Sequence, residues 1–388
     1  MPAIPCPICK NTDGNLTLDQ RAKVPTLQNV TLREPAAAKE FSTGEIEMEW
    51  CAKCSFVWNA AFDADLISYN AGYNNDVSYS AYYVAHLEAM ADRVIASVPD
   101  DQPIHYLEIG CGEADFLKLV MDRANGRCVS AFGFDPSFAS TDPLPDGAVV
   151  HRSFFGPDQL PLVPAATNVI CSRHTIEHVP DVQSFVSALA SPAQQGSRKL
   201  FIETPNVNWV LRQGAFQDFF YEHCSIYTPE SMAAALAQQG MRATTTPVYG
   251  GQYMWTEAEA GVPEAAAPID MTLAPSYIAQ SNAMLDGWEQ FLQEADGPVA
   301  LWGGASKGVT FALLMAERGS AELTCAVDLN TAKQGCFMPV TGLPIVSPAK
   351  AQDMGVRNLI VMNPNYRDEI VDLVASMDWQ AKITVLND

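Results

Sequence analysis

The sequence predicts an α/β protein in which a doubly wound, mostly parallel sheet lies between a small cysteine-rich module and a second, smaller α/β unit. Two observations carry this expectation. A buried strand, a glycine turn and a helix start follow one another twice, in HYLEIGCGEADFL from His105 and in GPVALWGGASKGVTFALLM from Gly297. Two C-x-x-C pairs lie near the N-terminus. The expected units are residues 1–69, 70–265 and 266–388, and a length of 388 residues agrees with two or three domains.

The composition limits the classes of partner. The chain has 23 basic and 45 acidic residues, and the resulting net charge of −22 disfavours binding to nucleic acid or to an anionic membrane surface. No apolar run is long enough to span a bilayer and no secretory signal is visible, so we expect a cytoplasmic protein that acts on a small molecule. Its ten cysteines are then expected to be reduced thiols or metal ligands.

Four cysteines among residues 1–69 have the spacing of a zinc site. Cys6 and Cys9 form one C-x-x-C pair and Cys51 and Cys54 form another, so four thiolates can surround one tetrahedral ion. A closed site of four cysteines leaves no position for substrate, so the expected Zn²⁺ is structural. The stretch GEIEMEWC alternates as a strand does and adds a small sheet. The alternatives are thiols without metal, a redox pair, or a nucleic-acid-binding module, which the few basic residues disfavour.

Residues 70–265 carry the signals of a nucleotide-binding sheet. A strand over 105–109 leads into Gly110 and Gly112, which allow a sharp turn and the close approach of a ligand. The next strand ends in Asp135, 25 residues after Gly110, where a carboxylate can accept both ribose hydroxyls. Further strands are expected in NVICS from Asn168 and in KLFIE from Lys199, with helical stretches between them.

The residue before the glycine turn helps to choose the ligand. Glu108 suits a cationic or hydroxyl-bearing ligand better than a pyrophosphate, and the incomplete G-x-G-x-x-G pattern disfavours NAD. The stretch LEIGCGEADFL resembles motif I of class I S-adenosylmethionine-dependent methyltransferases, with Ala114 in place of the third glycine. The resemblance implies S-adenosylmethionine as cofactor, with an acid and glycines at its methionine end, an acid on its ribose and two residues near its adenine. The implied contact residues are Glu108, Gly110, Gly112, Asp135, Ser153, Phe154 and Arg173.

A histidine pair follows the next strand. In CSRHTIEHVPD, His174 and His178 are four residues apart and would share one face of a helix. Such a pair could bind a metal ion, or one histidine could satisfy a helix start. The stretch resembles the segment after the fourth strand of class I methyltransferases, which faces the transferred methyl group and the substrate.

The stretch FFYEHCSIYTPES, from Phe219, joins aromatic residues to a carboxylate and an imidazole directly before a helix. Thr228 and Pro229 read as the N-cap and the first helical position. The residues before them therefore form a loop or short strand above the carboxyl ends of the sheet, where ligands bind. This position favours a catalytic loop over a solvated edge.

The order of cysteine pairs, methyltransferase core, ETPN, YEHC and a C-terminal α/β unit resembles the zinc-containing C-methyltransferases of nucleotide-linked keto-deoxysugars, over essentially the whole chain. The resemblance implies four catalytic residues, His223, Glu222, His178 and Tyr221. It also implies substrate-facing residues, for which the candidates are Tyr73, Tyr79, Asn206, Ser306 and Lys307. The chain departs from the family at Phe220 and Tyr221, where the family has tyrosine and histidine.

The C-terminal unit repeats the strand, turn and helix pattern, with strands expected in GPVALW, LTCAVD, NLIVM and KITVL. Backbone amides of residues 303–308 at a helix start could hold phosphate, with Lys307 adding positive charge. The other interpretation is a fold that serves packing alone. The family resemblance favours a role in holding the nucleotide part of the substrate.

These residues predict a mechanism of carbon methylation. His223 takes the proton from the carbon next to a ketone, and the resulting enolate attacks the sulfonium methyl group. Glu222 orients His223 or binds a substrate hydroxyl, and His178 or Tyr221 donates a hydrogen bond to the enolate oxygen. Two alternatives stay open: an oxygen or nitrogen acceptor with the same cofactor, and a non-enzymatic interaction module built on the zinc-binding segment.

Overall fold

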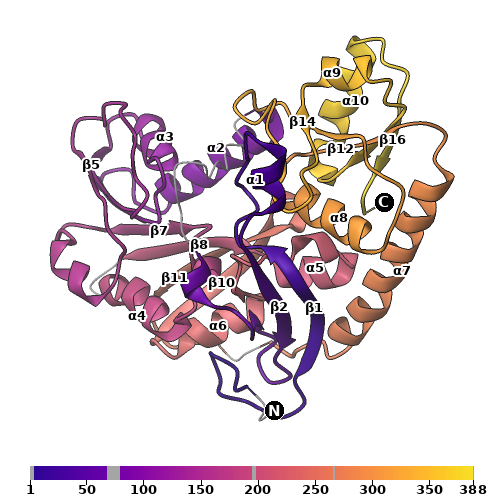
Figure 1. Ribbon diagram of the computed structural model, residues 1–388. Helices are drawn as coiled ribbons and strands as arrows, with labels where there is room; N and C mark the ends of the chain where they lie inside the picture. The colour runs from indigo at the N-terminus through magenta and orange to yellow at the C-terminus, as the bar shows by residue number, and fades with distance from the viewer. Residues whose placement is uncertain (1–3, 68–78, 195–197, 265–266, 388) are drawn as a thin grey trace.

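The computed structural model describes residues 4–67, 79–194, 198–264 and 267–387. They form a four-stranded sheet in an N-terminal module, a seven-stranded sheet in a core and a five-stranded sheet in a C-terminal unit. The core lies on the left of Figure 1 and the C-terminal unit at the upper right, with the indigo module in front. None of the described helices is both long enough and apolar enough to cross a membrane.

The core sheet has the strand order β10-β11-β8-β7-β4-β5-β6. The strands from β8 to β6 run parallel, whereas β11 runs antiparallel to both of its neighbours. This arrangement confirms the predicted doubly wound, mostly parallel sheet. In chain order, the strands are β4 (Ile104–Ile109), β5 (Cys128–Phe134), β6 (Ala148–His151), β7 (Val169–Arg173), β8 (Lys199–Pro205), β10 (Met241–Val248) and β11 (Tyr253–Ala260).

Helices cover both faces of this sheet, because neighbouring strand residues point to opposite sides. On β4, Tyr106 is buried in the cluster that includes α2 and α3, whereas Leu107 is buried in the cluster that includes α4 and α6. The core helices are α2 (Ala81–Ala96), α3 (Asp115–Arg123), α4 (Val182–Ala193), α5 (Val207–Gln213) and α6 (Pro229–Ala237). Short 3₁₀ turns follow several strands: η2 (Pro157–Leu162), η3 (Ile176–His178), η4 (Phe216–Asp218) and η5 (Tyr249–Gly251).

The N-terminal module has a sheet whose fourth strand comes from the core. Its antiparallel order is β1-β2-β3-β9, and β9 belongs to the FFYEHCSIYTPES stretch. The elements are β1 (Leu16–Pro25), α1 (Pro35–Lys39), β2 (Thr43–Trp50), β3 (Val57–Asn59), the turn η1 (Ala64–Leu66) and β9 (Ser225–Ile226). The strand predicted in GEIEMEWC is β2. The predicted boundary at residue 69 stays a prediction, since the module's sheet also draws on residues 225–226.

The C-terminal unit is a parallel sheet in the order β14-β13-β12-β15-β16. The helix α7 (Leu273–Glu294) connects it to the core and runs along the right side of Figure 1. Its strands are β12 (Val299–Trp302), β13 (Cys325–Val327), β14 (Ile345–Val346), β15 (Asn358–Val361) and β16 (Lys382–Val385). Its helical elements are α8 (Ser306–Glu317), α9 (Pro348–Asp353), η6 (Pro364–Tyr366) and α10 (Arg367–Ser376).

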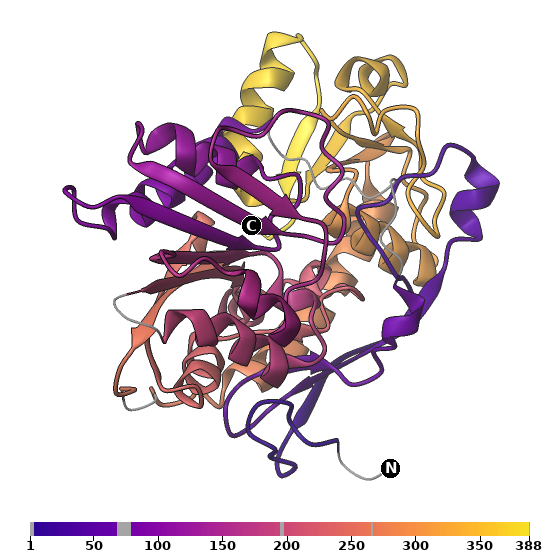
Figure 2. The same cartoon turned by 90° about the vertical axis from the view of Figure 1, so that its left-hand side faces the viewer.

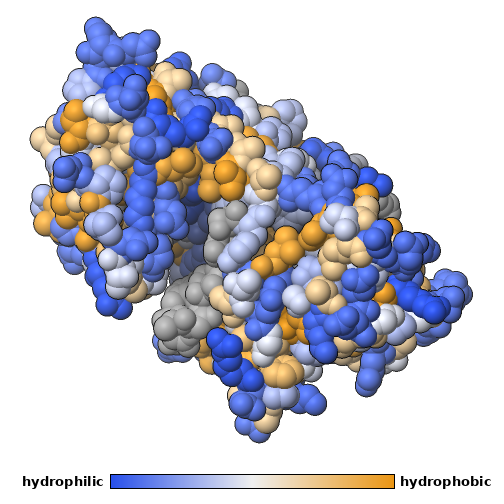
Figure 3. Space-filling model, turned by 90° about the horizontal axis from the view of Figure 1, so that it is seen from above, coloured by the Kyte–Doolittle hydropathy of each residue, from blue (hydrophilic) through white to orange (hydrophobic). Residues whose placement is uncertain are grey.

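The three units are joined by contacts between segments far apart in the sequence. Leu32 of the module forms a bridge with Phe337 of the C-terminal unit, and the Gln252 side chain of the core donates to Asn363 at 2.7 Å. Figure 2 shows the module along the lower right of the core and the C-terminal unit above both. Seen from above, the surface is hollowed between the core on the left and the C-terminal unit on the right (Figure 3).

The packing of the module against the core is tight at Gly44 on β2. A Cβ atom at this position would lie 2.2 Å from the Tyr221 ring, which is fully buried. We expect Gly44→Ala to lower the free energy of unfolding by about 1–3 kcal/mol, because the ring has no space to move. The control is Gly287→Ala on α7, where no heavy atom lies within 4 Å of the added Cβ. That change should raise stability by about 0.5–1 kcal/mol in urea-induced unfolding, and an equal response of both variants would contradict the expectation.

Candidate active site

The glycine turn after β4 forms an open cradle at the carboxyl edge of the core sheet. Gly110 and Gly112 have φ of +75° and +53°, a conformation that favours glycine. A Cβ at Gly110 would lie 1.9 Å from the Thr175 hydroxyl, whereas a Cβ at Gly112 would meet no atom within 4 Å. Gly110 is therefore required for packing, and Gly112 leaves space for a ligand.

Asp135 follows β5 and is fixed next to this cradle. One carboxylate oxygen accepts the Gly112 N–H at 2.8 Å, and the other accepts the N–H and the hydroxyl of Ser137 at 2.8 and 2.6 Å. The side chain thus joins the ends of two neighbouring strands in one arrangement. Since each carboxylate oxygen has two lone pairs, Oδ2 keeps capacity to accept a ligand hydroxyl.

Glu108 lies under the cradle as a buried acid. It is 2% exposed, and its Oε2 has no hydrogen-bond partner among the described residues. Burial raises the pKa of Glu108 to about 8, against the positive charge of Arg173, which lowers it. A buried carboxylate in this state gains a counterion when a cationic ligand group binds.

Arg173 forms an ion pair with a second buried acid, Glu203. Its Nε donates to Glu203 Oε2 at 2.6 Å, and its guanidinium carbon lies 4.2 Å from the centre of the Phe116 ring. Glu203 also contacts His86 Nε2 at 2.5 Å and is fully buried. Burial alone would raise the pKa of Glu203, but Arg173 and the hydrogen bond from His86 hold it well below its usual range. The prediction that Arg173 contacts the cofactor stays a prediction, with Nη2 as the atom that has no partner in the described part of the chain.

The structure brings three of the four predicted catalytic residues together. The rings of His178 and His223 lie 4.8 Å apart at 85°, and His178 Nδ1 lies 3.8 Å from Glu222 Oε2. Glu222 Oε1 accepts the backbone N–H of Gln28 at 3.1 Å, so the module reaches this cluster. We call His178, Glu222 and His223 the acid–base cluster.

A further buried acid, Glu177, adjoins this cluster and was not predicted as a site residue. It accepts the Thr204 hydroxyl at 3.0 Å and lies 3.3 Å from His174 Nδ1. Burial alone would raise its pKa, but the hydrogen bond and charge of His174, followed by the histidines of the cluster, lower it to about 2. One ligand atom from each of Glu177, His178 and His223 lies within 4.8 Å of the others.

His223 is partly exposed, but its Nδ1 is buried and has no partner among the residues described. Burial and the neighbouring His178 lower the pKa of His223 to about 3, and Glu177 opposes this shift. The imidazole is therefore neutral across the physiological pH range. A neutral ring with an unused nitrogen is a proton acceptor.

The expectation that His174 and His178 share a helix face is wrong. His174 has φ of +47° and lies outside the turn η3, which holds only Ile176–His178. The backbone instead turns so that His174 reaches Glu177 and His178 reaches Glu222. The histidine pair thus belongs to two different contacts.

Tyr221 does not join the acid–base cluster, and its predicted role at an enolate oxygen is corrected. Its hydroxyl donates to the Asp63 carbonyl at 3.0 Å and accepts the Asp63 N–H at 2.9 Å. The ring packs against Phe62, with centroids 5.2 Å apart. The residue lies in a turn, in which the His223 N–H donates to the Phe220 carbonyl at 3.2 Å, and this turn separates its side chain from His223.

The structure places the predicted adenine contacts at the surface after β6. Phe154 is 75% exposed, and the neighbouring Phe155 turns inward against Phe134 at 5.0 Å. The Ser153 N–H donates to the His151 carbonyl at 2.9 Å. An exposed ring beside the cradle leaves the role of both residues a prediction.

The predicted substrate residues occupy different environments. The Asn206 side chain caps α5 and donates to the Gly251 carbonyl at 3.0 Å. Ser306 donates to Asn29 of the module at 3.2 Å. Lys307 forms an ion pair with Asp218 and lies 5.3 Å from the Trp209 ring centre. Tyr79 is exposed and Tyr73 lies outside the described residues.

The C-terminal unit repeats the cradle geometry. The Gly304 N–H donates to Asp328 Oδ2 at 3.0 Å, as the Gly112 N–H does to Asp135 in the core. The turn before α8 therefore has the same type of hydrogen bond as the turn after β4, and phosphate binding at this turn stays a prediction. Its Ser306 and Lys307 face the module and η4, respectively.

The four cysteines of the module form one cluster. The Sγ atoms of Cys6 and Cys54 lie 3.6 Å apart, those of Cys9 and Cys51 lie 3.4 Å apart, and all four lie within 4.8 Å of one another. A tetrahedral ion with Zn–S bonds of about 2.3 Å separates its ligands by about 3.8 Å. The four thiols and the distances between their Sγ atoms fit Zn²⁺. The same distances are too long for the S–S bonds of disulfides.

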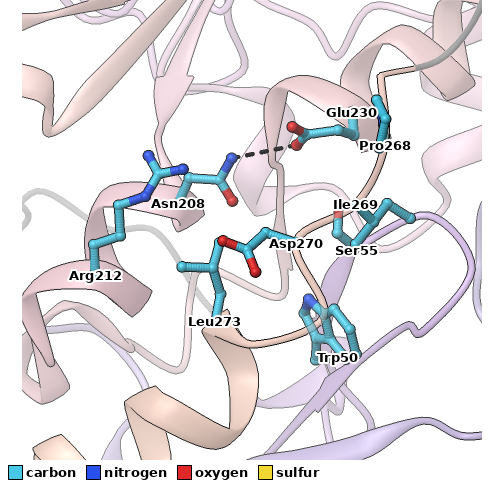
Figure 4. A pocket seen from close by; sticks show the side chains of 9 residues that line it. All are labelled: Trp50, Ser55, Asn208, Arg212, Glu230, Pro268, Ile269, Asp270 and Leu273. Atoms are coloured by element: carbon cyan, nitrogen blue, oxygen red, sulfur yellow. Dashed lines mark hydrogen bonds between the residues drawn. The ribbon is translucent and has the colours of Figure 1, made fainter.

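A small cavity lies where the module meets α5, α6 and the chain leading into α7 (Figure 4). The Asn208 amide donates to Glu230 at 3.3 Å in its wall. It is lined by residues of the module, of α5 and α6 and of the chain leading into α7: Trp50, Ser55, Asn208, Arg212, Glu230, Pro268, Ile269, Asp270 and Leu273. None of the predicted site residues lines it.

Two segments of the chain match known families. Residues 83–246 match the family described as a methyltransferase domain, and residues 277–386 match the family described as a C-methyltransferase C-terminal domain. The chain is 26% identical over 227 residues to the C-methyltransferase NovU of Streptomyces niveus. That match covers 53% of this chain and 53% of the relative, so it spans about half of the curated protein.

Two of the solved structures that match part of this chain are as follows. An O-methyltransferase family protein from Burkholderia thailandensis is 13% identical, covering 47% of this chain and 60% of its own, with a TM-score of 0.36. Human N-acetylserotonin methyltransferase in complex with SAM is 12% identical, covering 46% and 55%, with a TM-score of 0.37. Residues 83–246 are thus similar to a methyltransferase domain, and the strand order of the core is that of a doubly wound α/β sheet.

The ion pair between Arg173 and Glu203 makes a testable contribution to stability. We expect Glu203→Gln to lower the free energy of unfolding by about 3–5 kcal/mol, because it leaves the buried guanidinium without its counterion. The control is Glu257→Gln, which breaks the exposed pair with Arg93 and should cost less than about 1 kcal/mol. Urea-induced unfolding at pH 7 measures both, and losses of equal size would contradict the assignment of a buried, essential pair.

Proposed function

We propose that the chain is an S-adenosylmethionine-dependent methyltransferase that methylates a carbon next to the ketone of a nucleotide-linked sugar. The observation that carries the proposal is the acid–base cluster, in which neutral His223 lies beside His178 and Glu222 at the edge of a methyltransferase domain. A C-methyltransferase among its relatives and the match to a C-methyltransferase C-terminal domain support the choice of carbon as acceptor.

The cradle residues fit the cofactor. Glu108 is a buried acid without a counterion on Oε2 and suits the ammonium group, Gly112 leaves space for the backbone to approach, and Asp135 suits the ribose hydroxyls. When bound, S-adenosylmethionine supplies an electrophilic methyl group on sulfonium sulfur. A neutral Glu108 would lose its proton as the ammonium group binds.

His223 acts as the base in this proposal. The imidazole takes the proton from the carbon next to the ketone, and the electrons of the C–H bond move into the enolate. The enolate would then form the new carbon–carbon bond as the sulfur–methyl bond of the cofactor breaks, which would leave S-adenosylhomocysteine. A pKa of about 3 keeps the ring available at neutral pH. Such a ring is a weak base, so the transition state depends on Glu177 and Glu222, whose carboxylates stabilise the imidazolium that forms.

His178 stabilises the enolate oxygen in this proposal, since it lies next to His223 and is oriented by Glu222. One donor in such a position contributes about 10²–10³ in rate. Phe220 replaces the tyrosine of the resembling family and packs edge-on to His223 at 4.9 Å. It therefore contributes a wall that excludes water instead of a hydroxyl donor.

The C-terminal unit holds the nucleotide of the substrate in this proposal. The turn before α8 is lined by Ser306 and Lys307, which contact Asn29 and Asp218, residues of the module and of η4. η4 directly precedes the FFYEH stretch, so a phosphate bound at the turn would lie near the chain that carries His223. This placement would direct the sugar toward the acid–base cluster.

The assignment of His223 as base is tested by His223→Asn. We expect kcat to fall by about 10²–10⁴, because the variant removes the proton acceptor, while calorimetry shows unchanged affinity for S-adenosylhomocysteine. The control is His105→Asn on β4, whose ring contacts Ser130 away from the cluster. In the wild type, we expect kcat to stay constant as the pH is lowered past about 6.5, the usual pKa of histidine. The reason is that the pKa of His223 is about 3, so its imidazole stays neutral over this range.

Near-normal turnover of the His223→Asn variant would refute the base assignment. Proton NMR of the product separates the acceptors: a C–CH₃ signal supports the proposal, whereas an O–CH₃ or N–CH₃ signal replaces it with another methyltransferase reaction. Failure to bind S-adenosylhomocysteine would favour a non-enzymatic role.

We infer that the four cysteines bind one structural Zn²⁺. Metal analysis of purified protein should give one zinc per chain, and Cys54→Ser should lose it and unfold at a lower temperature, because one of four ligands is removed. Cys336→Ser, which changes a buried thiol of the C-terminal unit outside the cluster, should keep the metal. Equal zinc content in the wild type and Cys54→Ser would exclude the site.

A further inference from the structure

The segment that carries His223 lies between the N-terminal module and the core. We call residues 219–228 the catalytic segment. Its β9 strand pairs with β3 of the module, Val57 opposite Ile226 and Trp58 opposite Ser225. The Asn59 N–H extends this ladder by donating to the Cys224 carbonyl at 3.0 Å. The backbone of the segment is thus part of the module's sheet.

Side chains extend the contact in both directions. The hydroxyl groups of Ser55 and Thr228 are hydrogen-bonded at 2.6 Å. The rings of Phe56 and Tyr227 pack edge-on, with centroids 5.0 Å apart. Ser55 and Phe56 directly follow Cys54, so the cysteine cluster is next in sequence to this anchor. At the other end of the segment, Asp63 holds Tyr221 and the Gln28 N–H holds Glu222.

Other contacts of the segment are made with the core, where the Ser225 hydroxyl donates to the Val179 carbonyl at 2.9 Å and the Val207 N–H donates to the Tyr227 carbonyl at 3.0 Å. Phe220 and His223 pack edge-on to each other at 4.9 Å, and His223 meets His178 of the core at 4.8 Å. The module and the core therefore both contact the segment, and the module holds the residues directly before His223.

Arg21 on β1 fixes the start of the segment. Its side chain is 4% exposed, and it donates to the Phe219 carbonyl at 3.2 Å and to the Phe216 carbonyl at 2.6 Å. Asp19 pairs with the same guanidinium. A planar guanidinium can bind two carbonyls and a carboxylate at once, whereas an ammonium group cannot reproduce this fork.

We propose that the N-terminal module is the template that positions the catalytic segment, and that Arg21 is a positioning residue for His223. The inference rests on the proposed function for its kinetic test. A displacement of the base by about 1 Å costs about 10²-fold in rate without affecting a cofactor site built from other strands. The cradle residues Gly110, Gly112 and Asp135 directly follow β4 and β5, whereas the hydrogen bonds of Arg21 are made with Asp19, Phe216 and Phe219.

The test compares Arg21→Lys with Arg33→Lys, a change at an exposed arginine of the same module. For Arg21→Lys we expect kcat to fall by about 10–100-fold, with the affinity for S-adenosylhomocysteine and the zinc content within twofold of wild type. Arg21→Ala should regain activity when guanidinium ion is added at millimolar concentration. Arg33→Lys should match the wild type.

A second readout does not require turnover. In protein labelled with ¹⁵N-histidine, the ring signals of His223, assigned through His223→Asn, should move in Arg21→Lys and stay in Arg33→Lys. Unchanged signals, or a kcat within twofold of wild type, would overturn the inference. A parallel loss of zinc and of S-adenosylhomocysteine binding in Arg21→Lys would also overturn it, since it would indicate general unfolding. If the wild type transfers no methyl group while the His223 signals move as expected, the proposed function fails and the positioning role stands.

Discussion

The catalytic segment packs against the N-terminal module and against the core at the same time, and this constraint explains much of the arrangement around it. One part completes the module's sheet through β9, and another presents His223 to His178 at the carboxyl edge of the core sheet. The segment can do both because it turns at residues 220–223, where the His223 N–H donates to the Phe220 carbonyl at 3.2 Å. Tyr221 and Glu222 are held from the module, so the chain directly before His223 is bound by residues outside the seven-stranded core sheet.

Buried acids form the second feature of the site. Glu108, Glu177, Glu203 and Glu222 are each at most 2% exposed and lie along the carboxyl edge of the core sheet or next to it. Burial of a carboxylate is costly unless a cation or several donors accompany it. Glu203 has Arg173 and His86, and Glu177 has His174 and Thr204. Glu108 lacks such a counterion on Oε2 and is the acid best suited to a cationic ligand.

The sequence predicted the local elements well. The strands before Gly110 and Gly303 and the cluster of four cysteines were found because their signals are contained in short stretches: an apolar run, a turn residue or a fixed spacing. The acid–base cluster was anticipated from the family resemblance, and its geometry brings His178, Glu222 and His223 together. Contacts between distant segments were not accessible in this way. Nothing in the periodicity of residues 219–228 indicates that they pair with β3, and the resulting inward turn of Tyr221 toward Asp63 was therefore missed. The burial of Glu177 and Glu203 was not predicted either, because it depends on residues that the fold packs around them.

Hydrogen exchange of the catalytic segment measured by mass spectrometry tests the central claim most directly. If the module holds the segment, peptides covering residues 224–228 and β3 should exchange at a common slow rate while zinc is present. Both should become faster together when a chelator removes the metal, while β4 and β12 keep their protection. Retained protection of residues 224–228 after the β3 peptide has become fast would contradict the account, because it would show that the core alone holds the catalytic segment in place.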